Sequence, residues 1–218
     1  MQIKDWNHRW ENQMIGFHEN QANYHLTRYL DQFSIAKNAT VFVPLCGKSL
    51  DLIWLSQHGY QVIGIECSPK AVVDFFTEQN LSYETHQQGK LVAYTSSNIT
   101  IYQGDFFDLT EDHLKQCDLI YDRASFVAFT PAQWDQYILH LSTWFGDSTQ
   151  LFLVTLEYDQ NSMNGPPFSV PDKAVRNYYK EKSIAILEQL DVIDEGPKWR
   201  KSGLTSLLET SFKITNKN

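Results

Sequence analysis

The sequence predicts an α/β fold: a mostly parallel, twisted sheet of seven core strands, with one antiparallel strand at its edge. Three observations support it. Strand-like and helix-like segments alternate along the chain. Residues 151–156 are continuously apolar, as expected for a strand that is covered on both faces. Two strands near the C-terminus, 184–192 and 207–214, follow one another like a hairpin and supply the antiparallel edge.

The N-terminal 35 residues are predicted to form a helical cap. Apolar side chains recur every three to four positions in residues 3–15, and a similar pattern follows in residues 19–33. Neither segment precedes a strand-pairing signal. We therefore expect two helices that cover the sheet, with residues 1–35 lying over the ligand site.

The first strand–helix–strand unit covers residues 39–66. A strand at 39–45 is followed by a helix at 49–58, with Ser49 as its cap and Gly59 as its stop, and by a strand at 61–66. Ser68 and Pro69 then start a helix that reaches about Asn80, because a hydroxyl cap followed by proline favours a helix N-terminus.

The remaining elements follow in order. They are a hairpin within 91–103 that ends in a core strand at 99–103, a strand at 119–121, a helix at 131–145, the strand at 151–156, a Gly/Pro loop at 161–171, a helix at 172–182 and the two closing strands. No repeat or linker divides the 218 residues, so a single domain over residues 1–218 is expected.

Composition excludes several classes of partner. Lys and Arg number 18 against 26 Asp and Glu, and the net charge of −8 argues against nucleic acid and against an anionic membrane surface. The three cysteines are isolated, which indicates neither a zinc site nor a disulfide framework and fits a cytoplasmic location. No metal site is expected, and a monomer is the default for a compact acidic domain.

Gly47 and Glu66 predict the ligand site. In open α/β sheets, ligands lie beyond the carboxyl ends of the strands. Glu66 ends the second strand about 20 residues after the Gly47 turn, where a carboxylate can accept both hydroxyls of a ribose. The alternatives are an ordinary turn and a solvated acid. A phosphate loop is excluded because position 42 is Phe42 and not glycine, so a small adenosine-containing ligand is favoured.

Two further strand ends carry polar residues. Asp105, after Gly104, could accept a hydrogen bond from an adenine amino group while Phe106 covers the ring; an Asp turn before a helix is the alternative. Arg123 offers a forked cation for a ligand carboxylate, unless it pairs with a neighbouring acid such as Asp122.

Taken together, these residues resemble the thiopurine S-methyltransferase family, and its bacterial-type members in particular. The matching segments run in order along nearly the whole chain: Trp6, Trp10 and Gly16-Phe17-His18; Val43-Pro44-Leu45-Cys46-Gly47-Lys48-Ser49; Gly64-Ile65-Glu66; residues 75–81; Asp122-Arg123-Ala124; and Tyr158-Asp159 with Gly165-Pro166-Pro167-Phe168.

The resemblance implies a class I methyltransferase fold, a three-layer Rossmann-like sandwich that binds S-adenosyl-L-methionine. It places the cofactor on Trp10, Leu45, Glu66 and Arg123, with the Gly47 turn, Gly104 and Asp105 nearby, and it places Phe17 at the acceptor. The expected reaction is methyl transfer to the sulfur of a small aromatic or heterocyclic thiol. No catalytic acid or base is assigned, and Asp122 is the nearest candidate.

Other functions stay open at this point. Selenium or tellurium species, or a halide, could replace the thiol as acceptor. The chain could also be a non-catalytic sensor of an adenosyl ligand, although no further interaction module is visible. A nucleotide-dependent kinase or ATPase is opposed by Phe42.

Overall fold

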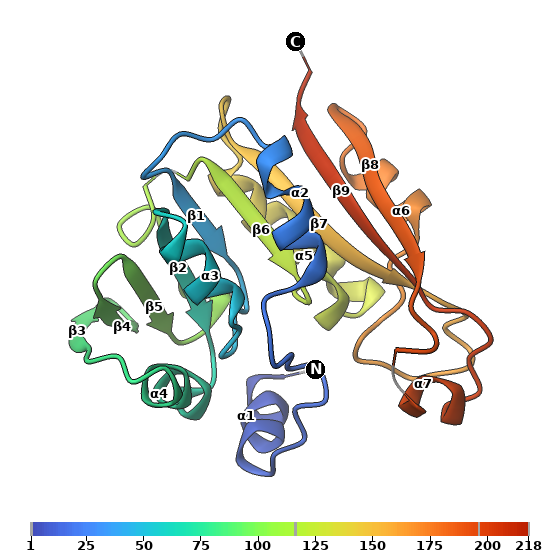
Figure 1. Cartoon of the computed structure of the whole chain (residues 1–218), viewed down its shortest axis with the longest axis horizontal. Coiled ribbons are helices and arrows are strands. Elements are labelled where there is room, and N and C mark those ends of the chain that lie inside the picture. The colour runs from blue at the N-terminus through green and yellow to red at the C-terminus, as the bar shows by residue number, and fades with distance from the viewer. Residues whose placement is uncertain (1, 116, 196, 218) are drawn as a thin grey trace. The chain divides into compact units, whose positions relative to one another are not determined.

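The computed structural model of the chain describes residues 2–115, 117–195 and 197–217 (Figure 1). The chain divides into two compact units, Met1–Tyr121 and Asp122–Asn218, which are described separately. In the described part of the chain, no helix has both the length and the apolar character of a membrane span.

The first unit is built around parallel strands. It contains α1 (Ile3–Glu11), α2 (Tyr24–Tyr29), η1 (Leu30–Gln32), β1 (Thr40–Val43), α3 (Asp51–Gln57), β2 (Gln61–Glu66), α4 (Pro69–Glu78), β3 (Glu84–Gln88), β4 (Leu91–Ser96), β5 (Ile99–Gln103), η2 (Phe106–Asp108) and the start of β6 (Leu119–Arg123). The strand order is β3-β4-β5-β2-β1-β6. β5, β2, β1 and β6 are parallel, whereas β3, β4 and β5 form an antiparallel meander.

Local signals in the sequence fix the elements around the site. The α3 helix ends in a Schellman arrangement: Gly59 has φ +89°, its amide donates to Ser56, and the Tyr60 amide donates to Leu55. The α4 helix begins as predicted, because the Ser68 hydroxyl accepts the amide of Ala71 and Pro69 occupies the first turn. The end of α3 and the start of α4 therefore follow from local turn chemistry. The prediction that Ser49 is the N-cap of α3 was wrong: the helix begins at Asp51, and its N-cap residue, Leu50, makes no side-chain cap hydrogen bond.

The second unit continues from the end of β6. It contains η3 (Phe126–Ala128), η4 (Pro131–Gln133), α5 (Trp134–Leu141), η5 (Ser142–Trp144), β7 (Gln150–Glu157), α6 (Asp172–Tyr178), β8 (Lys182–Asp191), α7 (Pro197–Lys201) and β9 (Leu208–Asn216). β9 lies between β7 and β8 and is antiparallel to both, with an irregularity in β8 between Ile186 and Glu188.

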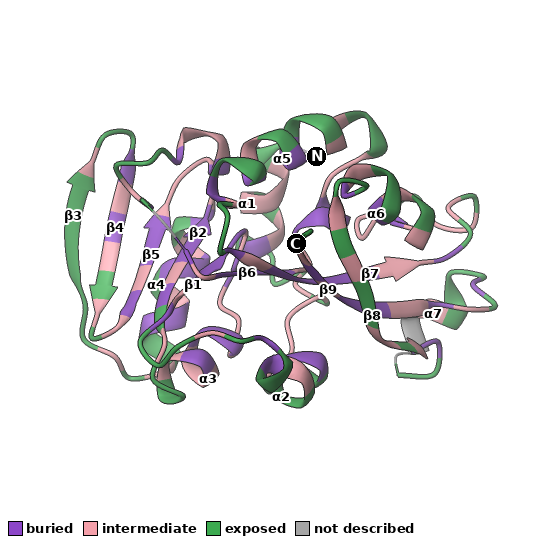
Figure 2. Cartoon of the chain, turned by 90° about the horizontal axis from the view of Figure 1, so that it is seen from above, coloured by how far each residue is buried: buried purple, intermediate pink, exposed green. Residues whose placement is uncertain are grey.

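The prediction of seven mostly parallel strands with a single antiparallel edge strand was wrong. The described residues contain nine strands, and the sheet pairing is mixed. β4 was expected only as one arm of a hairpin, and β3 was missed because its sequence, Glu-Thr-His-Gln-Gln, has no apolar alternation. Figure 2 shows why: β3 is mostly exposed, whereas β1 and β2 are mostly buried. An edge strand that buries neither face leaves no hydrophobic pattern to read.

Candidate functional site

The turn after β1 is shaped by backbone that favours glycine. Gly47 has φ +53°, and a Cβ atom at this position would lie 3.0 Å from Cζ2 of Trp10. Leu45 also has a positive φ, of 45°, which is uncommon for a residue with a side chain. The Cys46 amide donates to the carbonyl of Ile65 at 3.0 Å, which ties the turn to the end of β2.

Glu66, at the end of β2, faces this turn. Its Oε2 accepts the Gly47 amide at 2.9 Å, and its Oε1 accepts the Ser68 amide at 2.7 Å and the Cys67 thiol at 3.3 Å. The side chain is 5% exposed, so the alternative of a solvated strand-end acid was wrong. Burial raises the pKa of Glu66, and its hydrogen bonds oppose that rise by stabilising the charged form.

The arrangement fits a ribose diol. A carboxylate offers about four acceptor positions, and chain donors use three of those on Glu66, one of them the weak thiol donor of Cys67. Oε2 accepts one hydrogen bond, from Gly47. The absence of a Cβ on Gly47 lets the Trp10 ring pack against the turn, because a Cβ there would lie 3.0 Å from Cζ2 of Trp10 and 4.0 Å from Oε2 of Glu66. Binding of a ribose diol at Glu66, with displacement of the Cys67 thiol, stays a prediction.

Aromatic side chains from the N-terminal segment border the same turn. Trp10 on α1 is buried, and Phe17 is half-buried and meets Trp10 edge-on with ring centroids 5.5 Å apart. Trp6 contacts Phe17 in the same way at 5.7 Å. The structure thus brings Trp10, Gly47 and Glu66 together, with Phe17 adjacent to Trp10.

The end of β5 reaches the same region. The Gly104 amide donates to the main-chain carbonyl of Glu66 at 3.0 Å, and a Cβ on Gly104 would lie 2.4 Å from Cδ2 of Leu91. Asp105 caps η2 by accepting the Phe107 amide at 2.9 Å. The alternative of an Asp turn before a helix is therefore confirmed, and the role of Asp105 at adenine stays a prediction.

Asp122 and Arg123 belong to the second unit. Asp122 is fully buried; its Oδ2 accepts the Tyr137 hydroxyl at 2.7 Å, and its Oδ1 accepts the Phe126 amide at 3.1 Å. Burial raises the pKa of Asp122 to about 6. Burial also lowers the pKa of Arg123, an effect opposed by the charge of Glu209. The Asp122 carboxylate thus holds the start of η3, which is a structural task.

Sequence reasoning missed two polar residues beside the turn. Lys48 donates to both carboxylate oxygens of Glu78, and buried Asp51 accepts the Asn23 amide at 2.7 Å and the Tyr121 hydroxyl at 3.2 Å. Asp51 thereby connects α3 to the residue that caps α2. An acid in the first turn of a helix is favoured by the helix dipole, but the amide partner of Asp51, Asn23, lies 28 residues away, so the sequence alone does not indicate this contact.

The Gly/Pro loop of the second unit is held by a network of its own hydrogen bonds. The Tyr158 hydroxyl donates to the Pro167 carbonyl at 2.5 Å, and Gln160 accepts the Ser169 amide at 2.8 Å. The Phe168 amide donates to the carbonyl of Val127 in η3 at 2.6 Å. These contacts give the loop a defined conformation.

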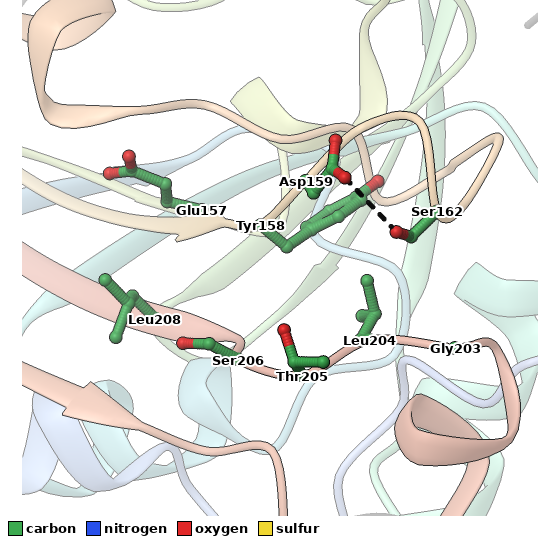
Figure 3. Close-up of a pocket in the computed structure, with 9 residues that line it drawn as sticks. All are labelled: Glu157, Tyr158, Asp159, Ser162, Gly203, Leu204, Thr205, Ser206 and Leu208. Carbon is green, nitrogen blue, oxygen red and sulfur yellow. Dashed lines mark hydrogen bonds between the residues drawn. The ribbon is translucent and has the colours of Figure 1, made fainter.

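A pocket of about 490 Å³ lies next to this loop, and Figure 3 shows its walls. Its lining combines two carboxylates, four hydroxyls and apolar side chains: Glu157, Tyr158, Asp159, Ser162, Gly203, Leu204, Thr205, Ser206 and Leu208. No acceptor contact was predicted in residues 203–208. Their sequence carries no recognisable motif.

Comparison with curated proteins gives full-length relatives. The chain is 42% identical over 215 residues to the thiopurine S-methyltransferase of Pseudomonas fluorescens (strain Pf0-1), covering 98% of this chain and 99% of the relative. It is 40% identical over 210 residues to the enzyme of that name from Pseudomonas entomophila, covering 96% and 97%.

Solved structures share the fold at much lower identity. A SAM-dependent methyltransferase from Anabaena variabilis superposes with a TM-score of 0.66 at 14% identity, covering 99% of this chain and 95% of that one. TehB from Haemophilus influenzae gives 0.59 at 15% identity, with 89% and 66% covered. The sequence also matches the thiopurine S-methyltransferase family over residues 1–217. The chain therefore has a class I methyltransferase fold and belongs to the thiopurine S-methyltransferase family.

Proposed function

We propose that this protein transfers a methyl group from S-adenosyl-L-methionine to the sulfur of a small aromatic or heterocyclic thiol. The observation that supports this most directly is the buried carboxylate of Glu66, which is oriented by the amides of Gly47 and Ser68 beside a turn that lacks a side chain. Membership of a family named for thiopurine S-methylation gives the reaction class.

Each candidate site residue of the first unit has a proposed role. Glu66 accepts the ribose hydroxyls, and Gly47 and Leu45 form the backbone against which the donor lies. Gly104 and Asp105 border the adenine. Trp10 and Phe17 cover the reacting atoms and exclude water. When bound, S-adenosyl-L-methionine supplies a methyl group made electrophilic by its sulfonium charge.

In the second unit, Arg123 is proposed to face the polar end of the donor. Its guanidinium is suited to binding a carboxylate through two hydrogen bonds. Asp122 is not proposed as a base, because its oxygens already accept the Tyr137 hydroxyl and the Phe126 amide.

The methyl transfer does not require a strong general base. An acidic thiol is largely ionised near neutral pH, so the chain needs to align the thiolate with the methyl group and keep water away. Alignment of this kind contributes about 7–11 kcal/mol in the best cases. The physiological acceptor is proposed to be a natural thiol of this type, because thiopurines are drugs.

The test combines binding and turnover. Glu66→Gln should weaken binding of S-adenosylhomocysteine by about 10- to 100-fold, the effect of losing a charged hydrogen-bond partner. Calorimetric titration measures the change, and Glu84→Gln, on the exposed strand β3, is the matched control. Methyl transfer is measured on thiols, selenite, tellurite and halides.

The outcomes separate the alternatives. Transfer to thiols in preference to the other acceptors supports the proposal, and preference for a metalloid or a halide moves the activity to that class. Binding without any transfer would indicate a sensor. Equal binding by wild type and Glu66→Gln would remove Glu66 from the site.

Location and assembly are also proposals. Among the described residues, Cys46, Cys67 and Cys117 are free thiols, which supports a reducing compartment such as the cytoplasm. We propose a monomer, which sedimentation at micromolar concentration would test.

A further inference from the structure

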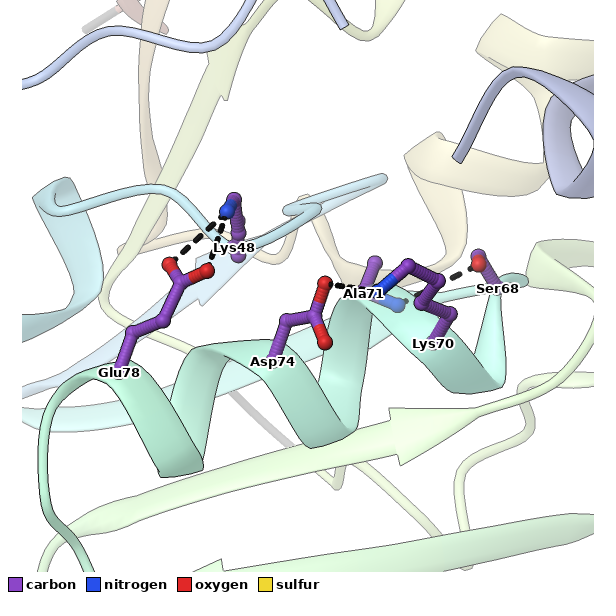
Figure 4. Close-up of polar contacts among 6 residues, drawn as sticks. All are labelled: Lys48, Ser68, Lys70, Ala71, Asp74 and Glu78. Atoms are coloured by element: carbon purple, nitrogen blue, oxygen red, sulfur yellow. Dashed lines mark hydrogen bonds and ion pairs between the residues drawn. The ribbon is translucent and has the colours of Figure 1, made fainter. Parts of the chain in front are cut away.

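Lys48 follows Gly47 directly, and its ammonium group is nearly buried. The Lys48 side chain is 10% exposed and that of Glu78 is 47% exposed. Nζ lies 2.6 Å and 2.8 Å from the two carboxylate oxygens of Glu78, the last residue of α4 (Figure 4). A buried ammonium is costly unless it is paired. Because both oxygens of Glu78 face it, Lys48 is already neutralised by the chain itself.

This pair joins the turn to the C-terminal end of α4, whereas Glu66 joins it to the N-terminal end. The Glu66 carboxylate bridges the Gly47 amide and the amide of Ser68, which caps α4. Ten residues of helix span about 15 Å. Two adjacent residues of the turn, Gly47 and Lys48, are therefore connected to opposite ends of the same rigid element.

A charged Glu78 does not stabilise α4 by itself. The C-terminus of a helix carries partial negative charge, which disfavours a carboxylate in the last turn. Lys48 offsets this repulsion. The ion pair therefore stabilises the contact between the Gly47 turn and α4 more than it stabilises α4 itself.

We propose that Lys48 is a positioning residue, whose ion pair with Glu78 holds the Gly47 turn in the geometry that receives the donor. This inference rests on the proposed function, because it assigns Lys48 a task at that same site. Lys48 contacts Glu78 and is not expected to contact the donor.

The same helix offers a matched control. Lys70 and Asp74 form an ion pair of 2.7 Å on α4, four residues apart, with side chains that are 37% and 24% exposed. Figure 4 shows both pairs, and only the Lys48 pair connects α4 to the turn. Lys70→Met therefore removes a lysine and an ion pair from α4 without touching the turn.

The experiment compares Lys48→Met, Glu78→Gln, Lys70→Met and the exchanged pair Lys48→Glu/Glu78→Lys. Titration with S-adenosylhomocysteine gives the dissociation constant, calorimetry gives Tm, and amide hydrogen exchange by NMR reports on Gly47. We expect Lys48→Met and Glu78→Gln to raise the dissociation constant roughly three- to tenfold, as expected for loss of a charge-assisted contact that acts indirectly. Gly47 exchange should accelerate, and the exchanged pair should recover part of both effects.

Lys70→Met should change Tm by a similar amount but leave Gly47 exchange and donor binding as in the wild type. If Lys48→Met lowers Tm while Gly47 exchange and the dissociation constant match those of Lys70→Met, the pair is only structural and the inference is wrong. If the wild type does not bind S-adenosylhomocysteine, the proposed function fails. In that case Gly47 exchange alone decides whether Lys48 holds the turn.

Discussion

Among the described residues, three acidic side chains are buried: Asp51, Glu66 and Asp122. Burial raises the pKa of each, and donors from the chain oppose the rise. Of these three, only Glu66 accepts a hydrogen bond from the Gly47 amide. The other two hold a capping segment and the start of η3, so burial of an acid alone does not identify a ligand-binding residue.

Asp122 should give the protein a measurable dependence of stability on pH. Its pKa rises from 3.8 to about 6 on folding, so folding favours the protonated form. The resulting stability is present below pH about 4 and is lost as the pH rises to about 6. At 1.36 kcal/mol per pKa unit, the loss is about 3 kcal/mol.

Asp122→Asn removes this dependence. The difference in the free energy of unfolding between variant and wild type should shift by about 2 kcal/mol in favour of the variant between pH 4 and pH 6.5. Urea titrations measure it, and Asp147→Asn, at an exposed acid, is the control. A pH-independent difference would show that Asp122 titrates alike in both states.

Gly47→Ala tests the shape of the turn. An L-residue at φ +53° costs about 1–2 kcal/mol, and the added Cβ would meet the Trp10 ring at 3.0 Å. We expect lower stability together with weaker binding of S-adenosylhomocysteine. Gly59→Ala is the matched control, because its φ is +89° and its Cβ would meet nothing within 4 Å. Equal binding by the two variants would show that the space at Gly47 is not needed.

At the scale of elements, the cap of α4 and the stop of α3 were predicted correctly, whereas the N-cap of α3, expected at Ser49, and the exposed segments were not. Ser68 and Gly59 act through hydrogen bonds to residues three positions away, and Pro69 acts through its fixed φ angle, so their signals are local. β3 has no buried face, and α7 spans only Pro197–Lys201. Neither element is long enough, or has a regular enough pattern of apolar residues, to be recognised from the sequence.

Ser68→Ala should weaken α4 by removing its N-cap acceptor. The expected loss is about 1 kcal/mol in the free energy of unfolding, measured in urea. Ser34→Ala, at an exposed serine, controls for the change of residue type. A loss no greater than that of the control would mean that another group satisfies the Ala71 amide.

At the scale of the whole molecule, the order of elements could be predicted but the strand pairing could not. The parallel pairing of β1 with β2 follows from a short helical crossover between two apolar strands. The position of β9 between β7 and β8 depends on contacts between residues far apart in sequence. Periodicity within a strand says nothing about its neighbours.

The candidate site was likewise predicted only where its signals are local in the sequence. Glu66 and Gly47 were identified because the glycine and the acid occur at a recognisable spacing at strand ends. Lys48 and Asp51 were missed because their partners, Glu78 and Asn23, lie 30 and 28 residues away. The pocket beside Tyr158 is bordered by residues 203–206 and 208, whose sequence carries no recognisable chemical motif.

Main-chain amides orient both oxygens of Glu66 before any ligand arrives. A side chain that is already fixed loses little rotational freedom on binding, so the proposed contact with a ribose has a low entropic cost. A glutamate on a mobile loop would first have to be ordered, and its hold on the sugar would weaken more steeply on warming.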